Sequence, residues 1–240
     1  MNETVLITGS GNGLGEAIAK IFAGNNYNVV LHGRNREHIE NLLNKISSFN
    51  INCNYIIGDL RNDKTLEEIN NITREKDVSV FINNAAARCS GLSLENIPEE
   101  NINDLIYVNL LVPIKLTKMI YPYFQAKRYG TFININSITA LEPKKFRSVS
   151  SAAKLGLDGF TNVFRKEALE YNVRVIGIFP TRINTKPEFE YGIHPDLVAK
   201  AIFDAYKDPL IENIILEGRP KQFRSAHKMN YTIHDLLNSG

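Results

Sequence analysis

Short apolar runs bounded by turn residues alternate along the chain with segments in which apolar residues recur every three to four positions. The first pattern is typical of buried strands and the second of amphipathic helices. Strands are predicted over Thr4–Ile7, Asn28–Leu31, Asn54–Ile57, Val78–Ile82, Thr131–Ile135, Val173–Phe179 and Asn213–Leu216. Helices are predicted over Leu14–Phe22, Arg36–Ile46, Glu99–Gln125, Ser151–Tyr171 and Pro195–Tyr206.

This alternation predicts an α/β fold with a doubly wound parallel sheet of about seven strands and helices on both faces. Parallel neighbours need crossover connections, and the crossover helices cover the faces of the sheet. A chain of 240 residues, 43% of them hydrophobic, is long enough for one large core. We therefore expect a single domain over residues 1–240, with a short substrate-lid segment near residues 185–208.

Composition and charge exclude several classes of protein. The net charge of +2 is spread along the chain, so no basic stripe for nucleic acid is expected. Cys53 and Cys89 are too few for a disulfide framework, and the apolar runs are far shorter than the ~20 residues that span a bilayer. No metal site is expected, because His38, His227 and His234 lack ligand partners at suitable spacing. A cytoplasmic protein without membrane partners is the expectation.

A glycine-rich turn, TGSGNGLGEA, joins the first predicted strand to the first predicted helix. Glycine permits a sharp turn and lets a pyrophosphate approach the amides at the helix N-terminus, where the helix dipole favours an anion. Tight turns before helices also need glycine, so the turn alone is a weak signal. The dinucleotide-binding candidates in this turn are Gly9, Ser10, Asn12, Gly13, Leu14 and Gly15.

Several motifs, taken in chain order, resemble those of the short-chain dehydrogenase/reductase family. Thr8-Gly9-x-x-x-Gly13-x-Gly15 resembles its glycine motif. Asn83-Asn84-Ala85-Ala86 resembles its Asn-Asn-Ala-Gly turn, and Pro180-Thr181 its later Pro-Gly, each without the glycine. The match runs in register from about residue 4 to residue 185. The chain is accordingly identified as a member of this family, whose fold is the Rossmann type.

The resemblance implies a role for each matching residue. Asp59 would meet the adenine ring, Lys154 the nicotinamide ribose and Thr185 the nicotinamide carboxamide. The other implied cofactor-binding residues are Leu60, Asn84, Ala85, Ala86, Pro180 and Ile183. The implied active-site residues are Asn109, Ser137, Ser150 and Lys154. The family's reaction, hydride transfer between a nicotinamide cofactor and a small carbonyl or alcohol substrate, is therefore expected, as is a homodimer or homotetramer.

Ser150 occupies the position of the tyrosine in the family's Tyr-x-x-x-Lys pair, in which the phenol passes a proton to or from the substrate. A serine hydroxyl cannot be tuned to that task, and loss of a positioned acid costs about 10² to 10⁴ in rate. Three explanations stay open. Tyr191, His194, Glu142 or Lys154 acting through water supplies the proton. Alternatively, the chain binds a nucleotide as a subunit or regulator without hydride transfer. Finally, the substrate needs no tyrosine, or engineering has removed it.

The end of the second predicted strand reads His32-Gly33-Arg34 and carries no acidic residue to accept the adenosine ribose hydroxyls. Arg34 instead offers a planar fork suited to a 2′-phosphate. NADP(H) is therefore favoured over NAD(H), the alternative being a solvated arginine at the start of the next helix.

Three basic residues, Lys144, Lys145 and Arg147, lie in the loop that would flank the substrate. They would suit an anionic ligand such as a nucleotide sugar. A solvated loop is the alternative and the favoured explanation, so the sequence does not identify the substrate.

Overall fold

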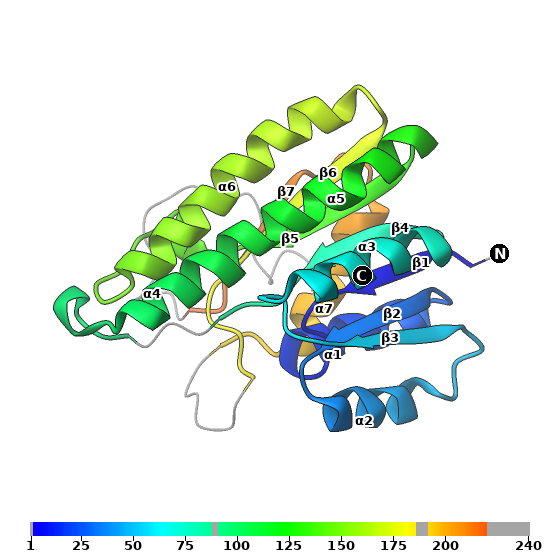
Figure 1. The fold of residues 1–240 in the computed structure, drawn as a ribbon, viewed down its shortest axis with the longest axis horizontal. Coiled ribbons are helices and arrows are strands. Elements are labelled where there is room, and N and C mark those ends of the chain that lie inside the picture. The colour runs from blue at the N-terminus through cyan, green and yellow to red at the C-terminus, as the bar shows by residue number, and fades with distance from the viewer. Residues whose placement is uncertain (1, 88–90, 186–191, 220–240) are drawn as a thin grey trace.

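The computed structural model describes residues 2–87, 91–185 and 192–219, and it contains a seven-stranded parallel sheet covered by helices on both faces (Figure 1). The strands are β1 (Thr4–Ile7), β2 (Asn28–Gly33), β3 (Cys53–Ile57), β4 (Val78–Asn83), β5 (Gly130–Ile135), β6 (Val173–Pro180) and β7 (Asn213–Leu216). Their order is β3-β2-β1-β4-β5-β6-β7. The predicted doubly wound sheet is confirmed, and the strand order reverses between β1 and β4.

Two layers of helices enclose this sheet. The helices are α1 (Gly13–Gly24), α2 (Arg36–Ile46), α3 (Asp63–Glu75), α4 (Glu99–Ile106), α5 (Val112–Lys127), α6 (Ser148–Leu169) and α7 (Pro195–Lys207). Helices α1, α2 and α7 pack in one apolar cluster, and α3, α5 and α6 pack in the other. Within β1, Val5 and Ile7 belong to the first cluster and Leu6 to the second, as the twofold alternation of a strand requires.

The predicted helix Glu99–Gln125 is wrong as one continuous helix. It is divided into α4, a π-helical turn over Tyr107–Leu111, and α5. Pro113 has no N–H with which to continue the α-helical pattern, and the Val112 N–H bonds the carbonyl of Tyr107 five residues back. The extra residue in this turn coincides with the burial of Asn109, which is 3% exposed.

The lid was predicted near residues 185–208, and most of the described residues in this range form α7, which packs in the core. Phe203 of α7 lies edge to face with Phe22 of α1, with 5.1 Å between ring centroids. Helix α7 therefore completes the first apolar cluster. Tyr191 and Cys89 lie outside the described residues. Within the described ranges, no helix is both long enough and apolar enough to cross a bilayer.

Candidate dinucleotide and active site

A cavity of about 1050 Å³ opens at the carboxyl ends of β1, β2, β3 and β4. In open α/β sheets, ligands bind at this edge, where the strand order reverses. The fold brings many of the predicted residues together in its lining: Gly9, Asn12, Gly13, Leu14, Gly15, Arg34, Asp59, Leu60, Asn84, Ala85, Ala86 and Thr185. Their convergence from five separate chain segments makes this cavity the candidate dinucleotide site.

The glycine turn between β1 and α1 has no room for a side chain at Gly9 or Gly15. Gly9 has φ +66°, and a Cβ there would lie 2.9 Å from the Cα of Ala85. A Cβ on Gly15 would lie 2.2 Å from the carbonyl oxygen of Gly9. Gly13, with φ +56°, is the first residue of α1. The turn thus exposes backbone amides at a helix N-terminus, the arrangement that binds a pyrophosphate.

Thr8 and Asn84 fasten this turn to the segment after β4. The Thr8 hydroxyl accepts the N–H groups of Asn84 and Ala85 at 3.0 and 3.1 Å and donates to the carbonyl of Ile82 at 3.2 Å. The Asn84 amide donates to the carbonyls of Thr8 and Gly9 at 2.9 and 3.0 Å. Asn84 therefore shapes the cavity wall by holding the backbone of the turn.

Ser10 does not line the cavity, although the sequence predicts it as a cofactor-binding residue. Its side chain is fully buried, and its hydroxyl accepts the N–H of His32 at 3.0 Å and donates to the carbonyl of His32 at 3.2 Å. Pro180 and Ile183 are also absent from the lining. Thr185 does line it, and its Cγ2 would be 3.2 Å from a Cβ placed on Gly13.

The Asp59 carboxylate is held by a neighbour that sequence reasoning missed. Arg61 donates to Asp59 from Nε, Nη2 and its backbone N–H, at 3.0, 2.7 and 2.9 Å. These hydrogen bonds lower the pKa of Asp59 to about 2. Arg61 also bonds Asp104 at 3.0 Å and lines the cavity. A basic residue two positions after Asp59 is the feature of the sequence that could have indicated this pairing.

Basic groups form the rim of the cavity near the end of β2. The Arg34 side chain is 74% exposed, and its Nη1 lies 3.9 Å from the Asp59 carboxylate. Arg36 lies over the ring of Tyr55, with 5.8 Å from Cζ to the ring centroid. Both guanidinium groups belong to residues that line the cavity, as do the carboxylates of Glu37 and Asp59.

Lys154 is buried on α6 beside the end of β5. Its Nζ donates to the carbonyl of Ile135 at 2.8 Å, and burial lowers its pKa to about 8. Ser150 lies one helical turn before Lys154 on the same helix and is partly buried. Ser137 follows β5, and its hydroxyl oxygen accepts the N–H of Thr139 at 3.2 Å. The described fold therefore places these three predicted residues around the carboxyl end of β5.

The amide of Asn109 is engaged by backbone rather than directed at a substrate. Its Oδ1 accepts the N–H of Ala87 at 2.8 Å, and its Nδ2 donates to the carbonyl of Ala87 at 3.2 Å. Asn109 joins the π-helical turn to the segment that follows the Asn-Asn-Ala-Ala motif.

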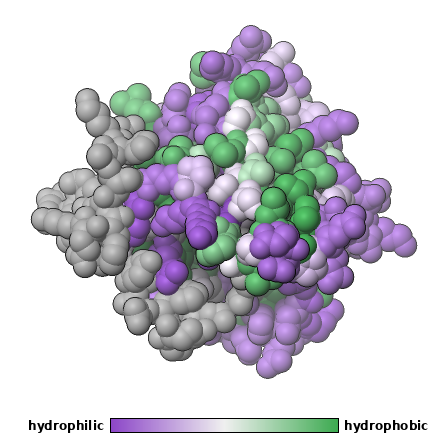
Figure 2. Space-filling view, turned by 90° about the vertical axis from the view of Figure 1, so that its left-hand side faces the viewer, coloured by the Kyte–Doolittle hydropathy of each residue, from purple (hydrophilic) through white to green (hydrophobic). Residues whose placement is uncertain are grey.

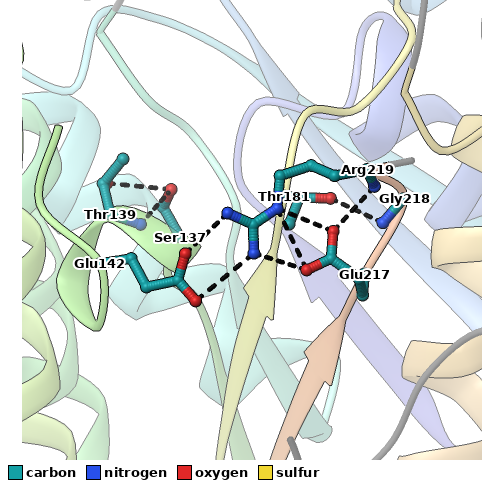
Figure 3. Close-up of polar contacts among 7 residues, drawn as sticks. All are labelled: Ser137, Thr139, Glu142, Thr181, Glu217, Gly218 and Arg219. Carbon is teal, nitrogen blue, oxygen red and sulfur yellow. Dashed lines mark hydrogen bonds and ion pairs between the residues drawn. The ribbon is translucent and has the colours of Figure 1, made fainter. Parts of the chain in front are cut away.

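Glu142 belongs to a buried ion cluster that the sequence did not indicate (Figure 3). Arg219 lies between two carboxylates: its Nη1 donates to Glu142 at 2.6 Å, and its Nε donates to Glu217 at 2.9 and 3.1 Å. The side chains of Arg219 and Glu142 are 5% and 11% exposed, and that of Glu217 is fully buried. The cluster ties the loop after β5, which contains Ser137, to the segment after β7.

Two of the alternative proton donors thus have other tasks in this structure. Glu142 Oε2 accepts a hydrogen bond from Nη1 of Arg219 at 2.6 Å. His194 is the N-cap residue of α7: its Nδ1 accepts the N–H of Asp196 at 3.3 Å, and its side chain is 65% exposed.

In the described part of the chain, no group of three or more His, Cys, Asp or Glu residues is arranged to hold a metal ion.

Comparison with known proteins identifies the family. The sequence profile described as short chain dehydrogenase matches residues 3–191. An uncharacterized oxidoreductase of Staphylococcus aureus strain USA300 is 26% identical over 221 residues, which span 89% of this chain and 94% of the relative. The chain therefore belongs to the short-chain dehydrogenase family, a class of oxidoreductases with the Rossmann fold.

Solved structures share the fold. A metagenomic short-chain oxidoreductase in complex with NADP superposes with a TM-score of 0.80 at 23% identity, over 89% of this chain and 96% of that one. An alcohol dehydrogenase from the archaeon Thermococcus sibiricus, complexed with 5-hydroxy-NADP, has a TM-score of 0.84 at 22% identity, over 92% and 100%. At this identity the likeness establishes the fold alone.

Lys154→Met tests the burial of the Lys154 charge. The native chain binds fewer protons than the unfolded chain between pH 8 and pH 10.5, so wild-type stability should rise through this window. Below pH 8 Lys154 is charged in both the native and the unfolded chain, so the desolvation of its buried ammonium lowers the free energy of unfolding by its full amount. We expect the variant to unfold at higher denaturant concentration than wild type at pH 7, and this difference to shrink from pH 8 to 10.5.

The matched control is Lys166→Met, which removes an exposed lysine from the same helix and should show no such pH dependence. Urea unfolding curves at six pH values would measure both. A constant difference between wild type and the Lys154 variant would mean that the ammonium is solvated.

Proposed function

We propose that this protein is an NADP(H)-dependent oxidoreductase that transfers hydride between the nicotinamide and a small carbonyl or alcohol substrate. The observation that carries the proposal is the glycine turn against Ala85, which opens the α1 N-terminus into a cavity at the point of strand reversal. The NADP and 5-hydroxy-NADP complexes of two structural neighbours support a nicotinamide dinucleotide. When bound, that cofactor supplies or accepts the hydride.

The residues present fit such a dinucleotide. The amides of the glycine turn would bind its pyrophosphate, and the adenosine would lie toward Asp59 and Leu60. The segment Asn84–Ala86 and Thr185 line the other part of the cavity and would hold the nicotinamide end. Lys154, from the resemblance, would bind the nicotinamide ribose. The cavity of about 1050 Å³ is at the upper end of the size range of small-molecule sites.

Arg34 supports the preference for NADP(H). It follows β2 in place of the acidic residue that binds ribose hydroxyls, and its side chain is 74% exposed at the rim. A guanidinium can donate two parallel hydrogen bonds to a phosphate, and such charge-assisted bonds are stronger than neutral ones. Arg36, on the face of Tyr55, adds a second positive charge near the same position.

Calorimetric titration with NADPH and NADH tests the cofactor and its preference together. We expect NADPH to bind at least about tenfold more tightly than NADH, because one charge-assisted phosphate contact contributes about 1.5 to 3 kcal/mol. Arg34→Ala should weaken NADPH binding by a similar factor and leave NADH binding within about threefold.

Lys64→Ala is the matched control, since Lys64 is exposed on α3 and does not line the cavity. Equal binding of the two cofactors by wild type would overturn the NADP preference. Binding of neither would overturn the dinucleotide site itself.

Lys154 is proposed as the proton source, with Ser150 in the position of the family tyrosine. The pKa of Lys154, lowered to about 8 by burial, leaves most of the amine protonated at pH 7 yet able to release a proton. Ser150, one turn earlier on α6, would position a water between this amine and the substrate oxygen. Tyr191 stays a second candidate donor. Ser150 also supports the alternative of a nucleotide-binding subunit or regulator without hydride transfer.

Ser150→Tyr tests this assignment of the position. A phenol placed there, one turn from Lys154, should raise the rate of NADPH oxidation on a panel of ketones and aldehydes by about 10² or more. The panel should include anionic carbonyl compounds, because Lys144 and Lys145 are exposed on the loop after β5. Initial rates followed by NADPH absorbance give the readout.

Ser148→Tyr is the matched control, because it places the same phenol at the exposed first residue of α6. Equal rates for wild type and Ser150→Tyr would show that another group already supplies the proton. No turnover by either, with tight NADPH binding, would favour the binding or regulatory role.

The outer surfaces of α5 and α6 support a homo-oligomer. Leu155 and Val163, eight residues apart on α6, are 47% and 58% exposed, and Leu111 beside α5 is 41% exposed. Apolar side chains also gather in a patch on the end of the molecule that carries α4 and the start of α6 (Figure 2). Exposed apolar faces of this kind mark interaction surfaces, and we infer that a second copy of the chain covers α5 and α6.

Sedimentation velocity measures the assembly directly. We expect a dimer or tetramer for wild type and a smaller species for Val163→Glu, because a carboxylate in an apolar interface is costly to bury. Lys166→Glu, on the same helix but at an exposed charged position, is the control. A monomeric wild type at micromolar concentration would contradict the inference.

A further inference from the structure

His32 is a buried histidine whose ring joins two backbone segments of the cavity. It lies in β2, is 2% exposed and lines the cavity floor. The N–H of Gly9 donates to His32 Nδ1 at 3.2 Å, and His32 Nε2 lies 3.1 Å from the carbonyl oxygen of Gly58. Gly9 belongs to the turn after β1, and Gly58 follows β3. One imidazole therefore spans from the strand on one side of β2 to the strand on the other.

The backbone of His32 strengthens the same connection. Its carbonyl accepts the N–H of Ser10 at 2.8 Å and the Ser10 hydroxyl at 3.2 Å, while its own N–H donates to the Ser10 oxygen at 3.0 Å. The N–H of Gly58 also donates to the carbonyl of Gly33 at 3.1 Å. His32 and its neighbour Gly33 thus fix the ends of β1, β2 and β3 relative to one another.

The partners of the ring determine its protonation. A backbone N–H can only donate and a carbonyl can only accept, so Nδ1 carries the lone pair and Nε2 carries the proton. The ring is neutral, and burial lowers the pKa of His32 to about 4. A second proton would have to sit on Nδ1 and face the N–H of Gly9, which would break that hydrogen bond and charge a buried group.

We propose that His32 is a positioning residue that sets the separation between the glycine turn and the end of β3, and thereby the affinity of the cavity for the dinucleotide. The inference rests on the proposed NADP(H) binding. Gly9 carries the left-handed turn that would receive the pyrophosphate, and Asp59 follows Gly58 at the adenosine end. The His32 ring acts through these backbone segments and does not have to touch the ligand.

Two substitutions separate the two hydrogen bonds of the ring. Asparagine places an oxygen near the position of Nδ1 and can still accept from Gly9, while it cannot reach Gly58. Glutamine places its amide near the position of Nε2 and can still donate to Gly58, while it leaves the Gly9 N–H without its acceptor. His32→Ala removes both bonds. NADPH affinity by calorimetry and thermal unfolding without ligand are measured on all four proteins.

We expect His32→Asn to keep NADPH binding within about threefold of wild type, and His32→Gln and His32→Ala to lose about tenfold or more, because an unpaired buried donor costs about 1–3 kcal/mol. Ile202→Ala, a core substitution in α7, controls for lowered stability alone: it should unfold earlier but bind NADPH as wild type does. The proposal would be overturned if wild type bound NADPH tightly and His32→Gln and His32→Ala bound it as tightly as wild type does. Failure of wild type to bind would instead refute the proposed function.

The pH dependence of stability is a readout that needs no ligand. Between pH 6.5 and 4 the unfolded chain protonates this histidine and the native chain does not, so wild-type stability should fall as the pH falls. As the pH falls, the equilibrium constant for unfolding should therefore rise by up to about tenfold more per pH unit in wild type than in His32→Asn. Other charged or titratable groups of the cavity near the ring are Arg34, Arg36, Glu37, His38, Asp59 and Arg61.

Because those groups are unchanged in the asparagine variant, subtraction of the two profiles isolates His32. The ¹⁵N chemical shifts of the ring should also show the Nε2–H tautomer at pH 7. Equal pH profiles, or a ring protonated on Nδ1 at pH 7, would contradict the geometry on which the proposal rests.

Discussion

The close approach of the glycine turn to the end of β4 is the constraint on which the candidate site depends. No side chain fits between Gly9 and Ala85 or between Gly15 and the carbonyl of Gly9. This contact lets Thr8 and Asn84 bond both segments at once, and it leaves the first amides of α1 facing the cavity. A larger residue at either glycine would separate β1 from β4 at the point where the strand order reverses. The shape of the candidate dinucleotide site at this turn is therefore determined mainly by backbone packing.

A second polar system orders the other end of the site. Thr181, where the family pattern has glycine, uses its hydroxyl to accept the N–H of Gly218 at 2.9 Å. The next residue, Arg219, holds Glu142 and Glu217, so the loops after β5, β6 and β7 form one connected unit (Figure 3). Buried charges persist only when they are paired and hydrogen-bonded. The departure from the family pattern at Thr181 therefore has a local structural role.

Two buried groups with lowered pKa values, His32 and Lys154, differ in their surroundings. His32 has two backbone partners that require a neutral ring, which suits a permanent structural task. Lys154 has one carbonyl partner, and its pKa of about 8 keeps both protonation states accessible near neutrality. Burial lowers the pKa of both groups, to about 4 for His32 and to about 8 for Lys154.

The sequence by itself determined the fold class, the sheet and the glycine turn of the cavity, because strand and helix periodicities and turn glycines are local signals. The predicted lining residues Asp59, Leu60, Asn84, Ala85, Ala86 and Thr185 came from the resemblance to the family. The sequence misjudged the helix over Glu99–Gln125, which is interrupted before Pro113 by a π-helical turn that places Asn109 against the backbone of Ala87. Only the tertiary structure decided that Ser10 lies beneath the cavity, that Glu142 is paired with Arg219, and that His32 joins two turns. Each of these depends on contacts between residues more than 20 positions apart, and no local pattern encodes such a distance.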